Sequence, residues 1–272
     1  MDLSQKRKIW KVKSMDKALI DLLFMSQKRK DLLLLLKNGE KTIEEIVDAL
    51  NVNPTGMLPQ IKKLKDEHLV LQEGREYRLT PLAEILVEKM EPLINTLQVI
   101  AENADFWQER YLTALPRMFL ERLDELQSCI IVKPDPDNIF EPSAVILENI
   151  EKSKRILSFS SIFHPVFSEM FLTNQDDDTE ITLVVTGKIY ERLKTDFEEK
   201  LKHYLAREKK RLFICTDEIE IAMLVKTEHF MAADFLTSKK SFDQETIIGF
   251  KPAALKWAED LILHYREQAQ EI

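Results

Sequence analysis

The chain has 272 residues, which is room for two domains. Its 39 Lys and Arg against 47 Asp and Glu give a net charge of −8. If that charge is evenly spread, it argues against a protein that coats nucleic acid, because such proteins neutralise phosphates with cationic side chains. No purely apolar run is longer than that of Leu32–Leu36, far short of the roughly 20 residues that span a bilayer, so we expect no membrane contact.

Several classes of chemistry lack their motifs. The five glycines are too dispersed for GxGxxG or a P-loop, which predicts no nucleotide cofactor. The five histidines form no HExxH and no Cys/His cluster, and GxSxG is absent, so we expect neither a metal site nor catalysis. The basic N-terminus is not followed by the apolar segment of a signal peptide, and Cys129 and Cys215 lie in apolar, β-branched surroundings. Free thiols and a cytoplasmic location are predicted.

Residues 16–37 are predicted to form a helix in two pieces, broken near Ser26. Thr42 and Glu45 have the spacing of a capping box, which starts a short amphipathic helix. Asn53 is a natural N-cap with Pro54 at the first helical position, so a second helix is expected over 54–67.

The 54–67 helix has a predicted apolar stripe and an opposite, exposed face. The stripe comprises Met57, Leu58, Ile61 and Leu64. The exposed face comprises Thr55, Gly56, Pro59, Gln60 and Lys63, with Lys62 on its flank. Two extended runs, 69–72 and 77–80, follow around a turn at 73–76. Helices, tight turn, helix and hairpin in this order predict a winged helix-turn-helix over residues 1–80.

Residues 81–128 are predicted to be helical, with interruptions at Pro92 and Pro116. Apolar residues recur at helical spacing from Leu93 through Leu97 and Ile100 to Ala104. Such a segment after a wing often links to a second domain and pairs two subunits, so it is a candidate homodimer interface. Packing within one chain is the alternative.

Residues 129–272 alternate between strand-like and helix-like segments. Strands are expected at 129–132, 155–160, 181–186, 211–216, 219–226 and 230–236, and helices at 142–154, 164–174, 188–206 and 252–268. The alternation predicts an α/β domain with a mostly parallel sheet, extended by antiparallel strands late in the chain. The whole protein is therefore expected to be of the α+β class.

The charge is unevenly divided between the two parts. Residues 1–80 hold 16 Lys and Arg against 12 Asp and Glu, a net charge of +4, whereas the remainder carries −12. A basic winged helix predicts binding to double-stranded DNA. Its helix would enter the major groove, with Lys62 and Lys63 on phosphates. The candidate DNA-binding residues are Thr55, Gly56, Gln60, Lys62, Lys63, Arg75 and Arg78.

A second candidate site follows from the parallel strands of the α/β domain, because ligands gather at the carboxyl ends of such strands. Small hydroxyls, a His and a Lys follow the predicted strands there, and they suit a small anionic or polar effector. The candidate effector-binding residues are Ser160, Ser161, His164, Thr186 and Lys188. Helix capping by the hydroxyls is the alternative.

Three segments resemble archaeal ArsR-like winged-helix regulators: Ser26–Leu36, Leu58–Leu64 and Tyr77–Thr80. The stretch 254–266 resembles the end of their methanogenesis-regulatory effector domain. The resemblance implies a dimeric transcription factor of methanogenic archaea, of the Methanosarcina group, that controls methylotrophic genes. That effector domain is similar to phospholipase-D-like sensor domains, but no His here has a Lys two residues later, so phospholipase catalysis is not implied.

The sequence therefore predicts a homodimeric DNA-binding transcriptional regulator whose C-terminal domain senses a small-molecule or protein effector. A winged-helix module for protein interaction and an α/β enzyme with a winged-helix dimerisation domain remain as alternatives.

Overall fold

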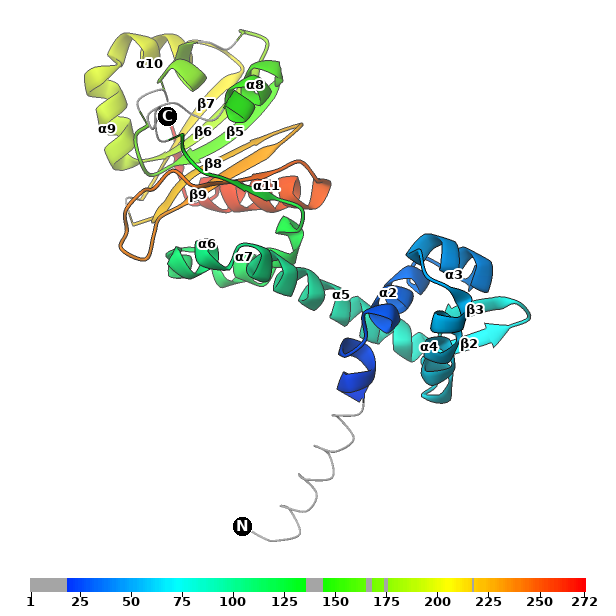
Figure 1. Ribbon diagram of the computed structural model, residues 1–272. Coiled ribbons are helices and arrows are strands. Elements are labelled where there is room, and N and C mark those ends of the chain that lie inside the picture. Colours follow the sequence, from blue (N-terminus) through cyan, green and yellow to red (C-terminus); the bar gives the residue numbers. More distant parts are fainter. Residues whose placement is uncertain (1–18, 136–143, 165–167, 174–175, 217) are drawn as a thin grey trace. The chain divides into compact units, whose positions relative to one another are not determined.

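The computed structural model describes residues 19–135, 144–164, 168–173, 176–216 and 218–272, and divides into two compact units, Met1–Leu93 and Ile94–Ile272. Figure 1 shows the elements of each unit. The predicted start of the first helix at residue 16, the expected helical residues 142–143, 165–167 and 174, and the basic residues before position 19 lie outside the described residues.

The N-terminal unit is a winged helix-turn-helix. Residues 19–24 are helical and the chain breaks at Ser26, as the sequence predicts. The following elements are α2 (Gln27–Leu36), β1 (Lys41–Thr42), α3 (Ile43–Leu50), α4 (Pro54–Asp66), β2 (Val70–Glu73), β3 (Glu76–Leu79) and α5 (Pro81–Glu102). The three strands form an antiparallel sheet in the order β1-β3-β2.

Local signals account for these boundaries. Thr42 Oγ1 accepts from the Glu45 backbone N–H at 3.3 Å, and the Glu45 carboxylate accepts from the Thr42 N–H at 2.7 Å, so the capping box is confirmed. Asn53 caps α4 by accepting from the Gly56 N–H at 2.7 Å. Gly74 has a φ of +62°, a left-handed conformation that glycine adopts without steric cost, and it allows the tight hairpin between β2 and β3.

The core of this unit is built by one side of each helix. Its buried side chains include Leu32, Leu33, Leu36, Ile46, Met57, Ile61, Leu64, Val70, Tyr77 and Leu79. Leu58 is 44% exposed, so its prediction as part of the apolar stripe was wrong. Met57, Ile61 and Leu64 already fill the buried side of α4, and the helical rotation carries Leu58 away from it.

The helix α5 continues through Pro92, so the interruption predicted there was wrong. A proline inside a helix forfeits one backbone hydrogen bond, but buried Val87 and Met90 precede it and buried Val99 follows, so the turns on both sides are anchored by packing. The helix ends at Glu102. The remaining helical pieces before the sheet are α6 (Ala104–Glu109), η1 (Leu112–Ala114), α7 (Arg117–Leu120) and η2 (Leu123–Leu126).

An eight-stranded sheet in the order β11-β7-β6-β5-β8-β9-β10-β4 forms the centre of the C-terminal unit. The strands are β4 (Ile130–Val132), β5 (Arg155–Ser160), β6 (Glu180–Thr186), β7 (Lys210–Cys215), β8 (Ile221–Thr227), β9 (Met231–Phe235), β10 (Thr246–Gly249) and β11 (Gln270–Glu271). The mixed helix and strand class is confirmed. Among the strands of the described residues, only β5–β6 and β6–β7 pair in parallel, so the antiparallel part is larger than expected.

The short connections between β8, β9 and β10 explain this balance, because they permit only antiparallel pairing. β10 and β11 were not expected from the sequence. Helices cover both faces of the sheet: α11 (Pro252–Arg266) lies on one, and α8 (Ala144–Lys152), α9 (Gly187–Asp196) and α10 (Glu198–Leu205), with the π-helical turn η3 (Ser168–Thr173), lie on the other (Figure 1). The helix expected over 188–206 is divided at Phe197.

Candidate nucleic-acid interface

The exposed face of α4 presents a small group of side chains from the second helix of the helix-turn-helix. Thr55, Leu58, Pro59, Lys62 and Lys63 are exposed. Lys62 and Lys63 therefore lie where the sequence analysis expects phosphate contacts. Asp66, also exposed, places a carboxylate at the C-terminal end of this face.

Gln60 is turned toward α2 rather than fully toward solvent. Its Oε1 accepts from Arg29 Nη1 at 2.9 Å, and the Arg29 guanidinium also donates to the carbonyl oxygens of Leu22 (2.6 Å) and Asp21 (3.0 Å). Gln60 is half-buried as a result. One lone pair of its carbonyl oxygen is thus occupied within the protein, which leaves the amide N–H groups and the second lone pair to meet DNA.

Gly56 lies beneath a cationic side chain. A Cβ added at Gly56 would be 2.7 Å from Lys28 Nζ and 2.8 Å from Asn53 Oδ1. The space at this glycine is therefore filled by protein side chains, and the Lys28 ammonium adds positive charge at the N-terminus of α4, where the helix dipole is also positive. Lys28 and Arg29 were not among the residues predicted to contact DNA, because only the fold brings α2 against α4.

The two arginines of the wing are both paired with carboxylates. Arg75, with a side chain 82% exposed, pairs with Glu44 on α3 at 2.8 Å. Arg78 pairs with Glu73 across the hairpin. Both pairs are at the surface, where ion pairs contribute about 0–1 kcal/mol, so either arginine can exchange its carboxylate for a phosphate at little cost.

The five candidate effector residues are distributed over two faces of the sheet in the C-terminal unit. Ser160 pairs with Val185 in the register, and Val185 packs with the helices α9 and α10. Thr186, the next residue, points to the opposite face, because side chains alternate along a strand. Lys188 is exposed on α9. These residues therefore do not line one common recess.

The serines are engaged with main-chain carbonyls. Ser160 Oγ donates to the Ile162 carbonyl oxygen at 2.5 Å and Ser161 Oγ to that of Ile221 at 2.6 Å. Thr186 Oγ1 is buried and has no hydrogen-bond partner among the described residues; it does not cap α9. His164 is buried and hydrogen-bonded to Gln244, and burial lowers its pKa.

A polar cluster near the end of β9 comprises the buried Arg110, Asp234 and Thr246 and the partly buried Asp243 and Glu245. The fully buried Arg110 guanidinium donates to Asp243 at 2.7 Å and to Glu245 at 2.8 Å. Asp234 opposes Thr246 in the register of β9 and β10. Burial raises the pKa of the Asp234 carboxyl to about 7, and its Oδ1 has no hydrogen-bond partner in the described part of the chain. The sequence analysis did not identify this cluster.

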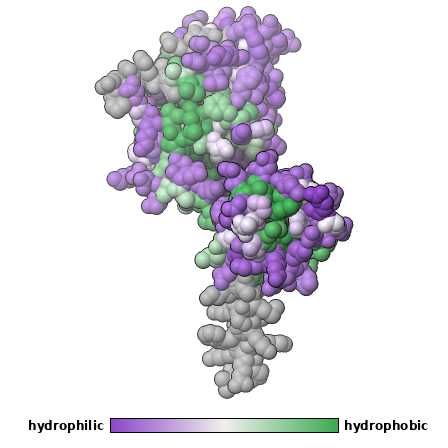
Figure 2. All heavy atoms as spheres, turned by 45° about the vertical axis from the view of Figure 1, so that its right-hand side comes forward, coloured by the Kyte–Doolittle hydropathy of each residue, from purple (hydrophilic) through white to green (hydrophobic). Residues whose placement is uncertain are grey.

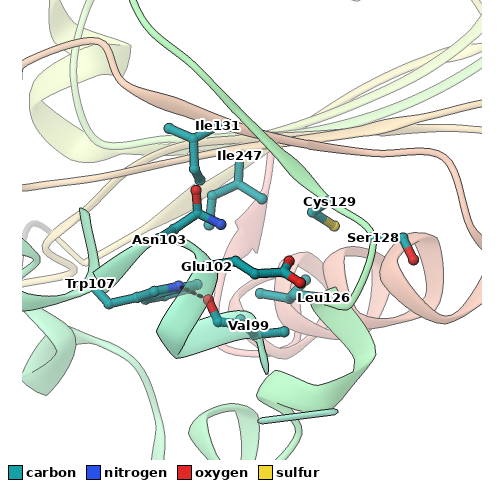
Figure 3. A pocket seen from close by; sticks show the side chains of 9 residues that line it. All are labelled: Val99, Glu102, Asn103, Trp107, Leu126, Ser128, Cys129, Ile131 and Ile247. Carbon is teal, nitrogen blue, oxygen red and sulfur yellow. Dashed lines mark hydrogen bonds between the residues drawn. The ribbon is translucent and has the colours of Figure 1, made fainter. Parts of the chain in front are cut away.

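A small recess in the C-terminal unit is lined by Val99, Glu102, Asn103, Trp107, Leu126, Ser128, Cys129, Ile131 and Ile247 (Figure 3). The space within it that a water centre can occupy is about 10 Å³, room for about one water molecule. Burial raises the pKa of the Cys129 thiol to about 12, so the reactive thiolate is scarce. The recess is too small for an effector of ordinary size.

The surface, the metal-binding residue types and the longest helices were compared with what other kinds of site require. The face of the molecule that Figure 2 shows is mostly hydrophilic, with hydrophobic residues gathered in smaller areas of each unit. Among the described residues, no group of three His, Cys, Asp or Glu is placed to hold a metal ion. No helix in the described ranges is long and apolar enough to cross a membrane.

The fold and the basic face of α4 define a winged-helix protein that carries a separate unit of mixed α and β structure. Residues 17–98 match the N-terminal domain, and residues 139–268 the middle domain, of the methanogenesis regulatory protein FilR1. Together these matches cover most of the chain, which belongs to the FilR1 family of methanogenesis regulatory proteins.

A curated relative, the methanogenesis regulatory protein FilR1 of Methanothrix harundinacea (strain 6Ac), is 25% identical over 252 residues. The match covers 91% of this chain and 56% of the relative, so this chain spans little more than half of that protein's length. Among solved structures, the archaeal chromatin protein TrmBL2 aligns over 91% of this chain and 94% of its own, with 14% identity and a TM-score of 0.42. Reduced HlyU from Vibrio cholerae aligns over 32% of this chain and 96% of its own, with 17% identity and a TM-score of 0.29.

Proposed function

We propose that this protein is a transcriptional regulator that binds double-stranded DNA through its N-terminal unit. The observation that carries the proposal is the exposed face of α4, where Lys62 and Lys63 lie beside Thr55, with the ammonium of Lys28 at the helix N-terminus. The wing adds Arg75 within reach of a neighbouring phosphate. This arrangement suits α4 in the major groove and the wing along the backbone. The family match supports a role in regulating methanogenesis.

We further propose that the regulator is a cytoplasmic homodimer of the ArsR-like type. The exposed apolar residues Leu82, Ile85 and Leu93 support the dimer: they are 72%, 56% and 50% exposed and share one side of α5. Exposed Lys89 lies between Ile85 and Leu93 on the same side, so the apolar surface is divided there. Exposed apolar patches on a helix mark surfaces for association. The finer assignment of its targets as methylotrophic genes rests on the sequence resemblance alone.

The C-terminal unit is proposed to sense a small-molecule or protein effector, as a phospholipase-D-like sensor domain would. The residues proposed to take part are Ser160, Ser161, His164, Thr186 and Lys188, which end the parallel strands or follow them. Because Ser160 and Thr186 face opposite sides of the sheet, we propose no single pocket that holds all five. Thr186 Oγ1, which is buried and has no partner within the described ranges, supports this proposal because an unsatisfied buried polar group costs about 1–3 kcal/mol, a cost that a ligand bond would remove. No catalytic role is proposed.

DNA binding is tested by selecting duplexes from a random pool with the full chain and measuring affinity against salt concentration. We expect enrichment of a sequence and a linear loss of log affinity with log salt. The variant Lys62→Glu with Lys63→Glu should reduce the slope by about 2, one unit for each lost phosphate contact. The charge-matched control Lys239→Glu with Lys251→Glu alters exposed lysines of the C-terminal unit and should leave the slope unchanged. Absent or salt-insensitive binding refutes the proposal and favours a module for protein interaction.

A further inference from the structure

The first two turns of α4 carry exposed apolar side chains. Thr55, Leu58, Pro59 and Lys62 share one side of the helix by their spacing. Leu58 is 44% exposed, and Pro59 beside it is exposed as well. The core does not need Leu58, because Met57, Ile61 and Leu64 are at most 2% exposed and occupy the inner side.

The polar side chains of this half of α4 are already engaged. Gln60 Oε1 accepts from Arg29, so the carbonyl that bidentate recognition of adenine requires already shares one of its two lone pairs with a cation. Thr55 donates its only hydroxyl hydrogen to Asn53 Oδ1 at 3.0 Å and keeps only acceptor capacity. Direct hydrogen bonding to base edges from this half of the helix is therefore limited.

Lysines on both sides of Leu58 along α4 indicate which kind of partner covers this apolar side chain. Lys62 and Lys63 follow Leu58 by about one turn, and Lys28 lies at the helix N-terminus. An apolar side chain between cations matches the major groove, where the C5-methyl group of thymine is displayed between two phosphate backbones.

We propose that Leu58, with Pro59 beside it, is a specificity-determining residue that recognises thymine through its C5-methyl group. This inference rests on the proposed binding of double-stranded DNA. The lysines fix the position of the helix on the backbone, and Leu58 discriminates at one or two base pairs because only a T·A pair presents a methyl group there.

The test replaces single thymines by uracil in a duplex selected from a random pool by the full chain. Uracil lacks only the methyl group. At one or two positions we expect about a fourfold loss of affinity, the value of burying one methyl group. Leu58→Ala should bind the thymine and uracil duplexes equally, whereas Leu58→Met, which keeps an apolar side chain of similar size, should retain the difference. Met118→Ala, which truncates an exposed apolar side chain in the C-terminal unit, should behave as the wild type.

The outcomes separate the two proposals. Salt-dependent binding with no effect of uracil at any position overturns the role of Leu58 and leaves DNA binding intact. A loss on uracil substitution that persists in Leu58→Ala also overturns it, because another group then reads the methyl. If the random pool yields no enriched duplex, the proposed function fails, and the role of Leu58 fails with it. Circular dichroism of each variant confirms that the fold is retained.

Discussion

Replacing Asp234 by Asn is expected to change how the stability of the C-terminal unit depends on pH. Asp234 is buried on β9, where it is hydrogen-bonded to Thr246 and faces Asp243 and Arg110. Burial is the largest cause of its raised pKa; Asp243 raises it further, while Thr246 and Arg110 lower it. Asn has the same shape but no charge at any pH.

The sign follows from the two pKa values of the carboxyl. The pKa of an aspartate carboxyl is 3.8 when it is exposed, whereas that of Asp234 is about 7 in the folded protein. The folded state therefore holds the proton more tightly. Below about pH 4 both states are protonated and no stability is lost. As the pH rises through 7 the full cost develops, because ionisation favours the unfolded chain. At about 1.4 kcal/mol for each pKa unit, that cost is about 4 kcal/mol.

Urea unfolding at constant ionic strength measures the effect. The fluorescence of the buried Trp107 and Trp257 reports on the C-terminal unit. Between about pH 5 and pH 8.5 the free energy of unfolding of Asp234→Asn should rise by about 3 kcal/mol relative to the wild type. Any cost of burying the amide is the same at each pH and cancels from this difference. The exposed control Asp105→Asn should run parallel to the wild type.

Parallel curves for Asp234→Asn and the wild type across this range would refute the reasoning. They would mean that Asp234 keeps an ordinary pKa in the folded protein, and therefore that water or a cation compensates its charge.

Two further predictions concern ion pairs. Glu44→Gln should tighten DNA binding about two- to fivefold at low salt, because it releases Arg75 from an exposed pair; a gain that persists when Arg75 is also replaced by Ala would contradict this cause. Arg110→Met should destabilise the C-terminal unit by about 3 kcal/mol in urea unfolding, because it leaves the partly buried Asp243 without its cation and Glu245 with only the exposed Lys133. The control Arg117→Met breaks a pair whose side chains are 89% and 62% exposed, so equal losses in the two variants would disprove the importance of burial.

The sequence by itself determined the elements whose signals are local. The capping box at Thr42, the Asn53 cap before Pro54 and the turn at Gly74 each involve residues at most three apart, so they specify helix starts and a hairpin without reference to the rest of the chain. The predicted winged-helix order followed from these signals. The short strand β10 was missed, because its four residues carry no boundary signal comparable to a helix cap.

Only the tertiary structure decided which exposed side chains of the candidate interface are available to DNA. Arg29 engages Gln60, and Glu44 engages Arg75, in each case across 31 positions of sequence. Arg110 reaches Asp243 across 133. Helical periodicity assigns a residue to one side of its own helix, but it does not specify the neighbour that packs there. The exposure of Leu58 and the burial of Asp234 depend on that neighbour, because packing between distant segments sets which groups lose contact with water.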